Sequence, residues 1–312
     1  MKLAEVVSQY VTYKQSIGMR FCTEKRTLKS FCRAMGDVSI AEVNPDSVLA
    51  FIAGTGPVTR FWHKKREVLF GFYSFAILRG YATTSPLPMA VPKLPQAFTP
   101  YIYSREEIRC LLQAADGCDH PRGTIQAHTC RALVMLLYGA GLRISEALAL
   151  TLTDADLSAG IIQIREGKFY KTRLVPLSAD LINVLTCYAI KRRREHSTQP
   201  DAPFFASRTG KRITLRAADG IFSRLRLRAG VRRSDGGRFQ PRLHDLRHAF
   251  AVHRLVSWYR QGSDVQRLLP QLATYLGHVH IAATQRYLTM TPELLREASK
   301  RFERYAWEES HE

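Results

Sequence analysis

The chain has 312 residues, of which 46% are hydrophobic, enough to build two cores of ordinary domain size. Its 46 Lys and Arg residues outweigh 27 Asp and Glu residues, and the formal net charge of +19 favours a polyanionic partner, nucleic acid before an anionic membrane surface. No apolar run reaches the roughly 18–20 residues that cross a bilayer, and the N-terminus lacks a signal-peptide core, so we expect neither a membrane-spanning nor a secreted protein.

The first part of the chain, residues 1–83, is predicted to be a small helical domain. Apolar residues recur at helical spacing over 7–17 and over 68–76, and shorter helices are predicted over 24–35 and 46–53. Five prolines then fall within residues 84–101, which excludes a continuous helix or a central strand. We interpret this segment as the linker between two domains.

Residues 102–312 predict a second domain of mixed structure. Two short β-branched runs across a turn, within 161–177, are typical of a hairpin. Amphipathic patterns and capping signals predict helices over 104–115, 126–139, 143–150, 178–196, 214–230, 243–260 and about 292–306. The predicted fold class is therefore mainly α with a small antiparallel β element.

The six cysteines show no framework of the kind that disulfides form, and a cytoplasmic protein is expected. Cys118, His120, His128 and Cys130 form a C-x-H and H-x-C pair of motifs. A single intervening residue is tight for the ligand pairs of a tetrahedral zinc site. We interpret the four as ordinary loop residues and expect no metal and no other cofactor.

Basic residues gather in stretches that suit contacts with phosphates, a solvated surface being the alternative for each. Contacts with phosphates contribute to affinity and make it depend on salt, but they do not select a nucleotide sequence. The candidates are Lys64, Lys65, Arg66, Arg192, Arg193, Lys211 and Arg212.

The segments GLRISE, IREGKFYKTRLVPL, HDLRHAF and YLGHVHIAATQRYL contain the residues that suggest chemistry. They supply six candidate catalytic residues, which are Arg143, Lys168, His244, Arg247, His278 and Tyr287. Arginine binds two phosphate oxygens at once and stays charged, so Arg143 and Arg247 are candidates for a phosphate clamp. A tyrosine hydroxyl is a nucleophile that needs help to lose its proton. The set suits transfer of a phosphodiester to a protein hydroxyl without a metal.

These motifs, in this order, resemble the tyrosine recombinase (phage-type integrase) family. The resemblance implies a helical core-binding (SAM-like) domain, followed by an α+β catalytic domain that cleaves double-stranded DNA. It implies that Tyr287 attacks the scissile phosphate to give a 3′-phosphotyrosyl intermediate and a free 5′ hydroxyl, without ATP. His278 would bind the phosphate, His244 would assist proton transfer or orient the tyrosine, and Lys168 would protonate the leaving oxygen.

Some assignments by resemblance remain open. The family often has glycine after the lysine, whereas Phe169 follows here, and Lys171 is a close competitor of Lys168. Glu146 is expected to support Arg143. The stretch between Arg247 and His278 favours a recombinase encoded by a mobile element, with roles in integration or transposition and partner recombinases encoded nearby.

The resemblance also implies an assembly: a homodimer on each site, a tetramer in the synapse with a Holliday junction intermediate, and a terminal helix over about 292–306 that docks on a neighbouring subunit. Packing of that helix on its own domain is the alternative. A monomeric type IB topoisomerase would share the nucleophile and the clamp. Two further classes compete with a recombinase: a DNA-binding protein that no longer uses its catalytic set and, more remotely, a membrane-surface protein.

Overall fold

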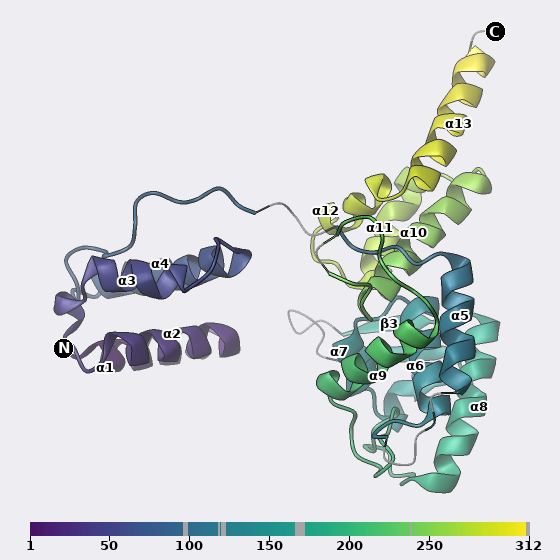
Figure 1. Cartoon of the computed structure of the whole chain (residues 1–312), viewed down its shortest axis with the longest axis horizontal. Coiled ribbons are helices and arrows are strands. Elements are labelled where there is room, and N and C mark those ends of the chain that lie inside the picture. The colour runs from purple at the N-terminus through teal and green to yellow at the C-terminus, as the bar shows by residue number, and fades with distance from the viewer. Residues whose placement is uncertain (96–98, 118, 120–122, 166–171, 238, 310–312) are drawn as a thin grey trace. The chain divides into compact units, whose positions relative to one another are not determined.

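The computed structural model describes residues 1–95, 99–117, 119, 123–165, 172–237 and 239–309, with side chains in the last helix described to Lys300 and at Glu303 (Figure 1). The chain divides into two compact units, Met1–Phe98 and Thr99–Glu312. The boundary between the two units falls inside the proline-rich segment 84–101.

The N-terminal unit is a bundle of four helices, α1 (Leu3–Ser16), α2 (Cys22–Met35), α3 (Pro45–Ala53) and α4 (Arg60–Leu78), with a short 3-10 turn, η1 (Ile40–Glu42). The Asn44 side chain caps α3 and Thr59 caps α4. Aromatic residues of α1, α2 and α4, among them Tyr10, Phe31 and Phe72, fill the core. Most of the aromatic residues of these helices therefore pack in the interior, whereas Phe61 and Phe70 of α4 are exposed.

The C-terminal unit begins with α5 (Arg105–Asp116), which starts at a capping box formed by Ser104 and Glu107. Helices α6 (Ala127–Gly139) and α7 (Ile144–Ala149) follow, then η2 (Leu152–Asp154) and the sheet. The remaining elements are α8 (Ala179–Glu195), α9 (Leu215–Arg228), α10 (Asp245–Arg260), α11 (Val265–Leu276), α12 (Ala282–Gln285), η4 (Arg286–Thr289) and α13 (Pro292–Glu309).

The sheet is small and antiparallel. Strands β1 (Ala155–Asp156), β2 (Ile161–Ile164) and β3 (Arg173–Pro176) pair in the order β1-β2-β3, with Ile162 opposite Val175. Ile162, Ile164 and Val175 are buried, because alternate residues of each strand face the helices. The predicted hairpin and the predicted fold class, mainly α with a small antiparallel element, are confirmed.

Helix α11 was not predicted from the sequence. Asp264 caps it by accepting a hydrogen bond from the Arg267 backbone, but Pro270 lies inside it, and an internal proline argues against a helix. Its apolar residues, including Leu269, Leu272 and Leu276, pack with those of α10 in a second core of this unit. Tertiary packing thus outweighs the local preference here.

Candidate active site

Three sequence motifs meet at the ends of α7, α10 and α11, and their arginines hydrogen-bond to one another's backbone. Arg143, at the start of α7, donates from Nη2 to the carbonyl of Gly277, 2.9 Å away. Arg247, on the first turn of α10, donates to the carbonyls of Gly141 and Leu276 at 2.7 and 2.6 Å. The GLR, H-x-x-R and LGH motifs are therefore locked into one unit.

The two glycines allow this close approach. Gly141 and Gly277 have φ values of +59° and +68°, a region that residues with a side chain rarely adopt. A Cβ on Gly277 would lie 2.8 Å from the guanidinium of Arg173, and a Cβ on Gly141 would meet the Phe250 ring. Both positions thus need glycine to present a carbonyl to an arginine.

Arg247 is almost completely buried, with 2% of its surface exposed. Burial and the nearby charge of Arg143 lower the pKa of its guanidinium to about 10, so it remains protonated at neutral pH. Its two carbonyl contacts use two of the five N–H groups of a guanidinium. Arg247 is therefore a fixed positive charge close to Tyr287, and this charge acts to lower the pKa of the tyrosine.

Glu146 supports Arg143 as predicted, but it also binds an arginine that the sequence did not single out. Its carboxylate accepts from Arg143 Nη1 at 2.7 Å and from both terminal nitrogens of Arg173 at 3.0 and 2.8 Å. Burial alone would raise the pKa of Glu146, but the guanidiniums of Arg173 and Arg143 outweigh it and hold that pKa at about 2. The carboxylate is therefore ionised and fixes both arginines.

Arg173 joins the hairpin to the rest of the site. It starts β3, and its Nε donates to the carbonyl of Tyr275 at the end of α11, at 3.0 Å. A sequence signal for Arg173 exists in RLVPL. It lies two residues before the buried Val175, so both residues are on the same face of the strand. Lys168 and Lys171, the two candidates for the general acid, lie outside the described residues, on the segment that connects β2 to β3.

Tyr287 lies in η4 with 2% of its surface exposed, and its hydroxyl oxygen is 3.0 Å from Nδ1 of His248. The histidine at the tyrosine hydroxyl is thus His248, one helical turn beyond His244, and it was not among the predicted catalytic residues. The His244 ring packs edge-on to the His248 ring, with 4.9 Å between centroids. The repeat of histidine four residues apart in HDLRH is the signal that could have identified it.

His278 follows α11 and stacks against the nucleophile candidate. Its ring centroid is 6.1 Å from that of Tyr287, and its Nδ1 lies 2.7 Å from the hydroxyl of the buried Thr284. Burial and the charges of Arg247 and Arg143 lower the pKa of His278 to about 4. Burial and Arg247 also lower the pKa of His244. Both imidazoles are therefore neutral near pH 7.

The structure thus brings five of the six predicted catalytic residues, Arg143, His244, Arg247, His278 and Tyr287, into one site. Burial raises the pKa of Tyr287, whereas Arg247 and Arg143 act in the opposite direction. A phosphate that entered between these arginines would meet a concentrated positive charge and a tyrosine hydroxyl. The arrangement can stabilise a pentacovalent phosphorus and deliver an oxygen nucleophile to it.

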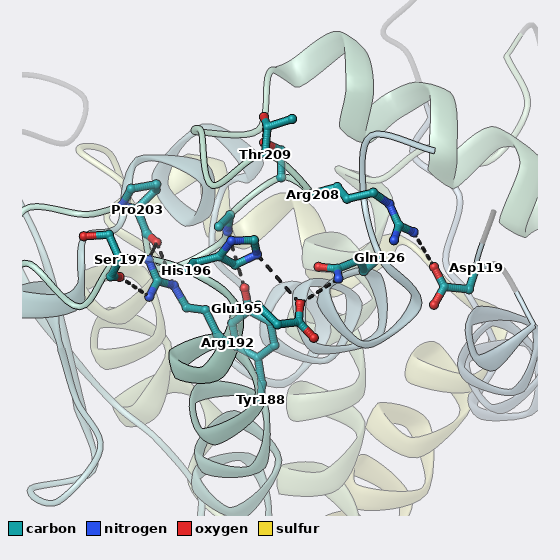
Figure 2. A network of polar contacts seen from close by, with 12 residues as sticks. Asp119, Gln126, Tyr188, Arg192, Glu195, His196, Ser197, Pro203, Arg208 and Thr209 are labelled. Atoms are coloured by element: carbon teal, nitrogen blue, oxygen red, sulfur yellow. Dashed lines mark hydrogen bonds and ion pairs between the residues drawn. The ribbon is translucent and has the colours of Figure 1, made fainter. Parts of the chain in front are cut away.

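The prediction that Arg192 contacts phosphates is wrong. Arg192 is 1% exposed, and its guanidinium donates to the carbonyls of Pro203 and Ser197 at 2.8 and 2.7 Å. Figure 2 shows the side chain directed from α8 toward the loop that contains those two residues. Arg192 therefore anchors this loop, because the carbonyls there satisfy a buried guanidinium.

The remaining predicted DNA contacts differ in exposure. Lys65 donates to the Phe51 carbonyl at 2.5 Å and Arg66 donates to the Pro88 carbonyl, so both stabilise the N-terminal unit. Lys64 is exposed and pairs with Glu24 and Glu67. The exposed residues of the C-terminal unit that remain candidates are Arg193, Lys211 and Arg212, the last of which also donates to the Ala149 carbonyl.

Cys118 and His120, two residues of the C-x-H and H-x-C motifs, lie outside the described residues. Among the residues that are described, no group of three or more His, Cys, Asp or Glu side chains is arranged to hold a metal ion. Within the same part of the chain, no helix has both the length and the apolar character to span a bilayer.

The comparison with known proteins agrees with this site. Residues 103–293 match the model of the phage integrase family. The chain is 36% identical over 310 residues to the y4rB protein of Sinorhizobium fredii, which bears the name integrase/recombinase, and the match covers 98% of each chain. It is 32% identical over 229 residues to tyrosine recombinase XerD of Mycobacterium tuberculosis, covering 73% of this chain and 68% of XerD.

Among solved structures, the integrase of the transposon Tn1549 in complex with transposon right-end DNA superposes with a TM-score of 0.71. The superposition covers 98% of this chain and all of that one, at 16% sequence identity. At this identity the likeness concerns the fold, which is shared along the chain.

Proposed function

The chain belongs to the phage integrase family and is a site-specific tyrosine recombinase, and from this premise we propose that Tyr287 attacks a scissile phosphate of double-stranded DNA. The attack forms a 3′-phosphotyrosyl bond and releases a 5′ hydroxyl. The observation that supports this most directly is the place of Tyr287: its hydroxyl is held at 3.0 Å from His248, beside the interlocked arginines of three motifs.

Arg143 and Arg247 bind the non-bridging oxygens of the phosphate in this proposal. Their side chains are already held by backbone carbonyls and, for Arg143, by Glu146, so little reorganisation is needed when the phosphate arrives. His278 donates a hydrogen bond to the same phosphate. His244 acts on the tyrosine through the His248 ring that it contacts.

The leaving 5′ oxygen takes a proton from Lys168, which we favour over Lys171. Arg173 fixes the start of β3 against Glu146 and Tyr275, directly after the segment with both lysines. The phosphotyrosyl bond keeps the energy of the original phosphodiester. The strand is therefore rejoined without ATP, and we propose that neither step needs a metal.

Recombination in this proposal takes place between two DNA sites, each bound by a dimer, in a tetramer that passes through a Holliday junction. The N-terminal unit and the exposed basic residues of the C-terminal unit hold the DNA. In the structure, α13 packs on its own α10 through ion pairs of Arg260 with Glu293 and Glu297. We propose that α13 instead docks on a neighbouring subunit in the assembly, and that a mobile element encodes the protein together with partner recombinases.

The experiment that tests this function compares the wild-type protein with Tyr287→Phe on supercoiled DNA that carries the sequences flanking the gene. Covalent protein–DNA complexes are recovered and the DNA ends are sequenced. We expect discrete 3′ attachment points with the wild type and none with Tyr287→Phe, while DNA binding is unchanged because only a hydroxyl is lost. Strand cutting that persists in Tyr287→Phe would remove Tyr287 as the nucleophile.

A further inference from the structure

Helix α10 holds two tyrosines by the same kind of contact. His248 Nδ1 lies 3.0 Å from the hydroxyl of Tyr287, and His253 Nδ1 lies 2.9 Å from the hydroxyl of Tyr138. The first pair includes the proposed nucleophile, so an inference about His248 rests on the proposed function. The second pair lies five residues further along the same helix and provides a built-in comparison.

The hydroxyl of Tyr287 can hand its proton to few groups. Arginine offers only donors, so Arg247 cannot accept it. The Nδ1 atom of His278 is already 2.7 Å from the Thr284 hydroxyl. In the described part of the chain, the Tyr287 hydroxyl forms a hydrogen bond with His248 Nδ1, and this atom can accept a proton.

We propose that His248 is a further catalytic residue, whose Nδ1 orients the Tyr287 hydroxyl and accepts its proton as the tyrosine attacks the DNA. The ring carries its own hydrogen on Nε2 before the reaction. As Oη approaches phosphorus, the Tyr287 O–H bond breaks and the proton moves to Nδ1. The Oη–P bond forms, the P–O5′ bond breaks, and the 5′ oxygen leaves with a proton from the lysine of the proposed function. Religation reverses each transfer.

The surroundings of His248 keep its imidazole neutral until then. Burial, together with the nearby guanidiniums of Arg247 and Arg242 and the His244 and His278 rings, lowers the pKa of His248 to about 3. A neutral ring keeps a free lone pair for the tyrosine proton. A phosphate bound by the arginines would offset part of this positive charge and raise the pKa of His248. Proton acceptance is thereby coupled to the presence of DNA.

The test uses two substitutions that separate the functions of the ring. His248→Ala removes the contact, whereas His248→Asn leaves a side-chain oxygen near the place of Nδ1 that can accept a hydrogen bond but cannot take up a proton. His253→Asn is the matched control, because it alters the same type of contact, on the same helix, to Tyr138. Single-turnover formation of the covalent complex is measured on a duplex that carries the attachment point found with the wild-type protein.

Both His248 variants are expected to cleave at least about 100-fold more slowly than the wild type, the scale of general base catalysis. Their affinity for the duplex, and that of His253→Asn, should match the wild type, and His253→Asn should cleave normally. The shape of the pH profile is the second readout. Without an internal acceptor the rate follows the phenolate fraction and rises about tenfold per pH unit, whereas the wild-type rate is nearly flat.

Normal or faster cleavage by His248→Ala would overturn the proposal, and so would a slowed His248→Asn whose pH profile keeps the wild-type shape. His248→Asn covers the case in which His248→Ala does not fold, since both circular dichroism and DNA binding report on its fold. A wild-type protein that forms no covalent complex would contradict the proposed function itself. Wild-type cleavage with unaffected His248 variants would contradict this inference alone.

Discussion

At the scale of single residues, the arginines of the site are held in place by backbone carbonyls and, for Arg143, by the Glu146 carboxylate. Arg143 and Arg247 each donate to a carbonyl of a glycine in another motif, and those glycines adopt positive φ values to present it. The sequence motifs therefore have a structural function as well as the proposed chemical one. This dual function explains why substitution of the buried Arg247 would affect folding and activity together.

Arg143 is the better residue for a test of the clamp, because Arg173 still pairs with Glu146 when Arg143 is removed. Arg143→Ala should slow single-turnover cleavage about 100-fold or more, since a preorganised positive charge at the phosphate is lost. Duplex affinity and the melting temperature should change little. Arg109→Ala, which removes an exposed arginine paired with Glu106, is the control of equal charge and should cleave normally. A wild-type rate for Arg143→Ala would exclude it from the clamp.

At the scale of elements, Glu146 and Arg173 connect α7, β3 and the end of α11. The hairpin and the helices other than α11 and α12 follow from apolar periodicity and caps such as Ser104 and Thr59, so they were predictable from the sequence. The contact of Arg173 with Glu146 joins residues 27 apart in the chain, and no local pattern contains such a pairing. The same holds for His248: its spacing from His244 was visible, but its approach to Tyr287 depends on how η4 packs on α10.

This connection predicts a pH dependence of stability. Because the pKa of Glu146 is lowered to about 2, its ionised form stabilises the fold above the ordinary glutamate pKa, and that contribution is lost as the pH falls toward 2. We expect Glu146→Gln to be less stable than the wild type by roughly 2–3 kcal/mol near pH 7. Urea unfolding should show the difference shrinking as the pH falls below about 4.5.

Glu106→Gln is the matched control, because Glu106 is an exposed carboxylate in a surface ion pair, and such pairs contribute little to stability. Its unfolding free energy should follow the wild type at every pH. A gap between the wild type and Glu146→Gln that stays constant from neutral pH to acid would show that the charge of Glu146 has no part in this stability.

At the scale of the whole molecule, the net charge of +19 and the exposed basic residues suit a polyanion as long as DNA. Composition predicted the class of partner but not which basic residue faces it. Arg192 and Arg193 are neighbours on α8, and the structure buries the first while it exposes the second. A sequence stretch of four basic residues does not reveal which side of a helix meets the core.

This pair allows a direct test of DNA contacts. Arg193→Ala should reduce the slope of log affinity against log salt by about 0.9 on non-specific duplex, since one phosphate contact is lost. Arg192→Ala should leave that slope unchanged and lower the melting temperature, because the Pro203 and Ser197 carbonyls lose their donor. Fluorescence anisotropy at several salt concentrations measures the first effect. Equal slopes for Arg193→Ala and the wild type would exclude Arg193 from the DNA interface.

Peptide mapping can test directly whether Tyr287 is the nucleophile, because trypsin separates it from the neighbouring tyrosines. Tryptic cleavage after Arg286 and Arg296 releases Tyr287 as the first residue of its own peptide, whereas Tyr275 lies in the preceding peptide and Tyr305 in a later one. The covalent complex formed on DNA is digested with nuclease and trypsin, and the modified peptide is identified by mass spectrometry. We predict a nucleotide adduct on the Tyr287 peptide; an adduct on the peptide of Tyr275 or Tyr305 would contradict this assignment.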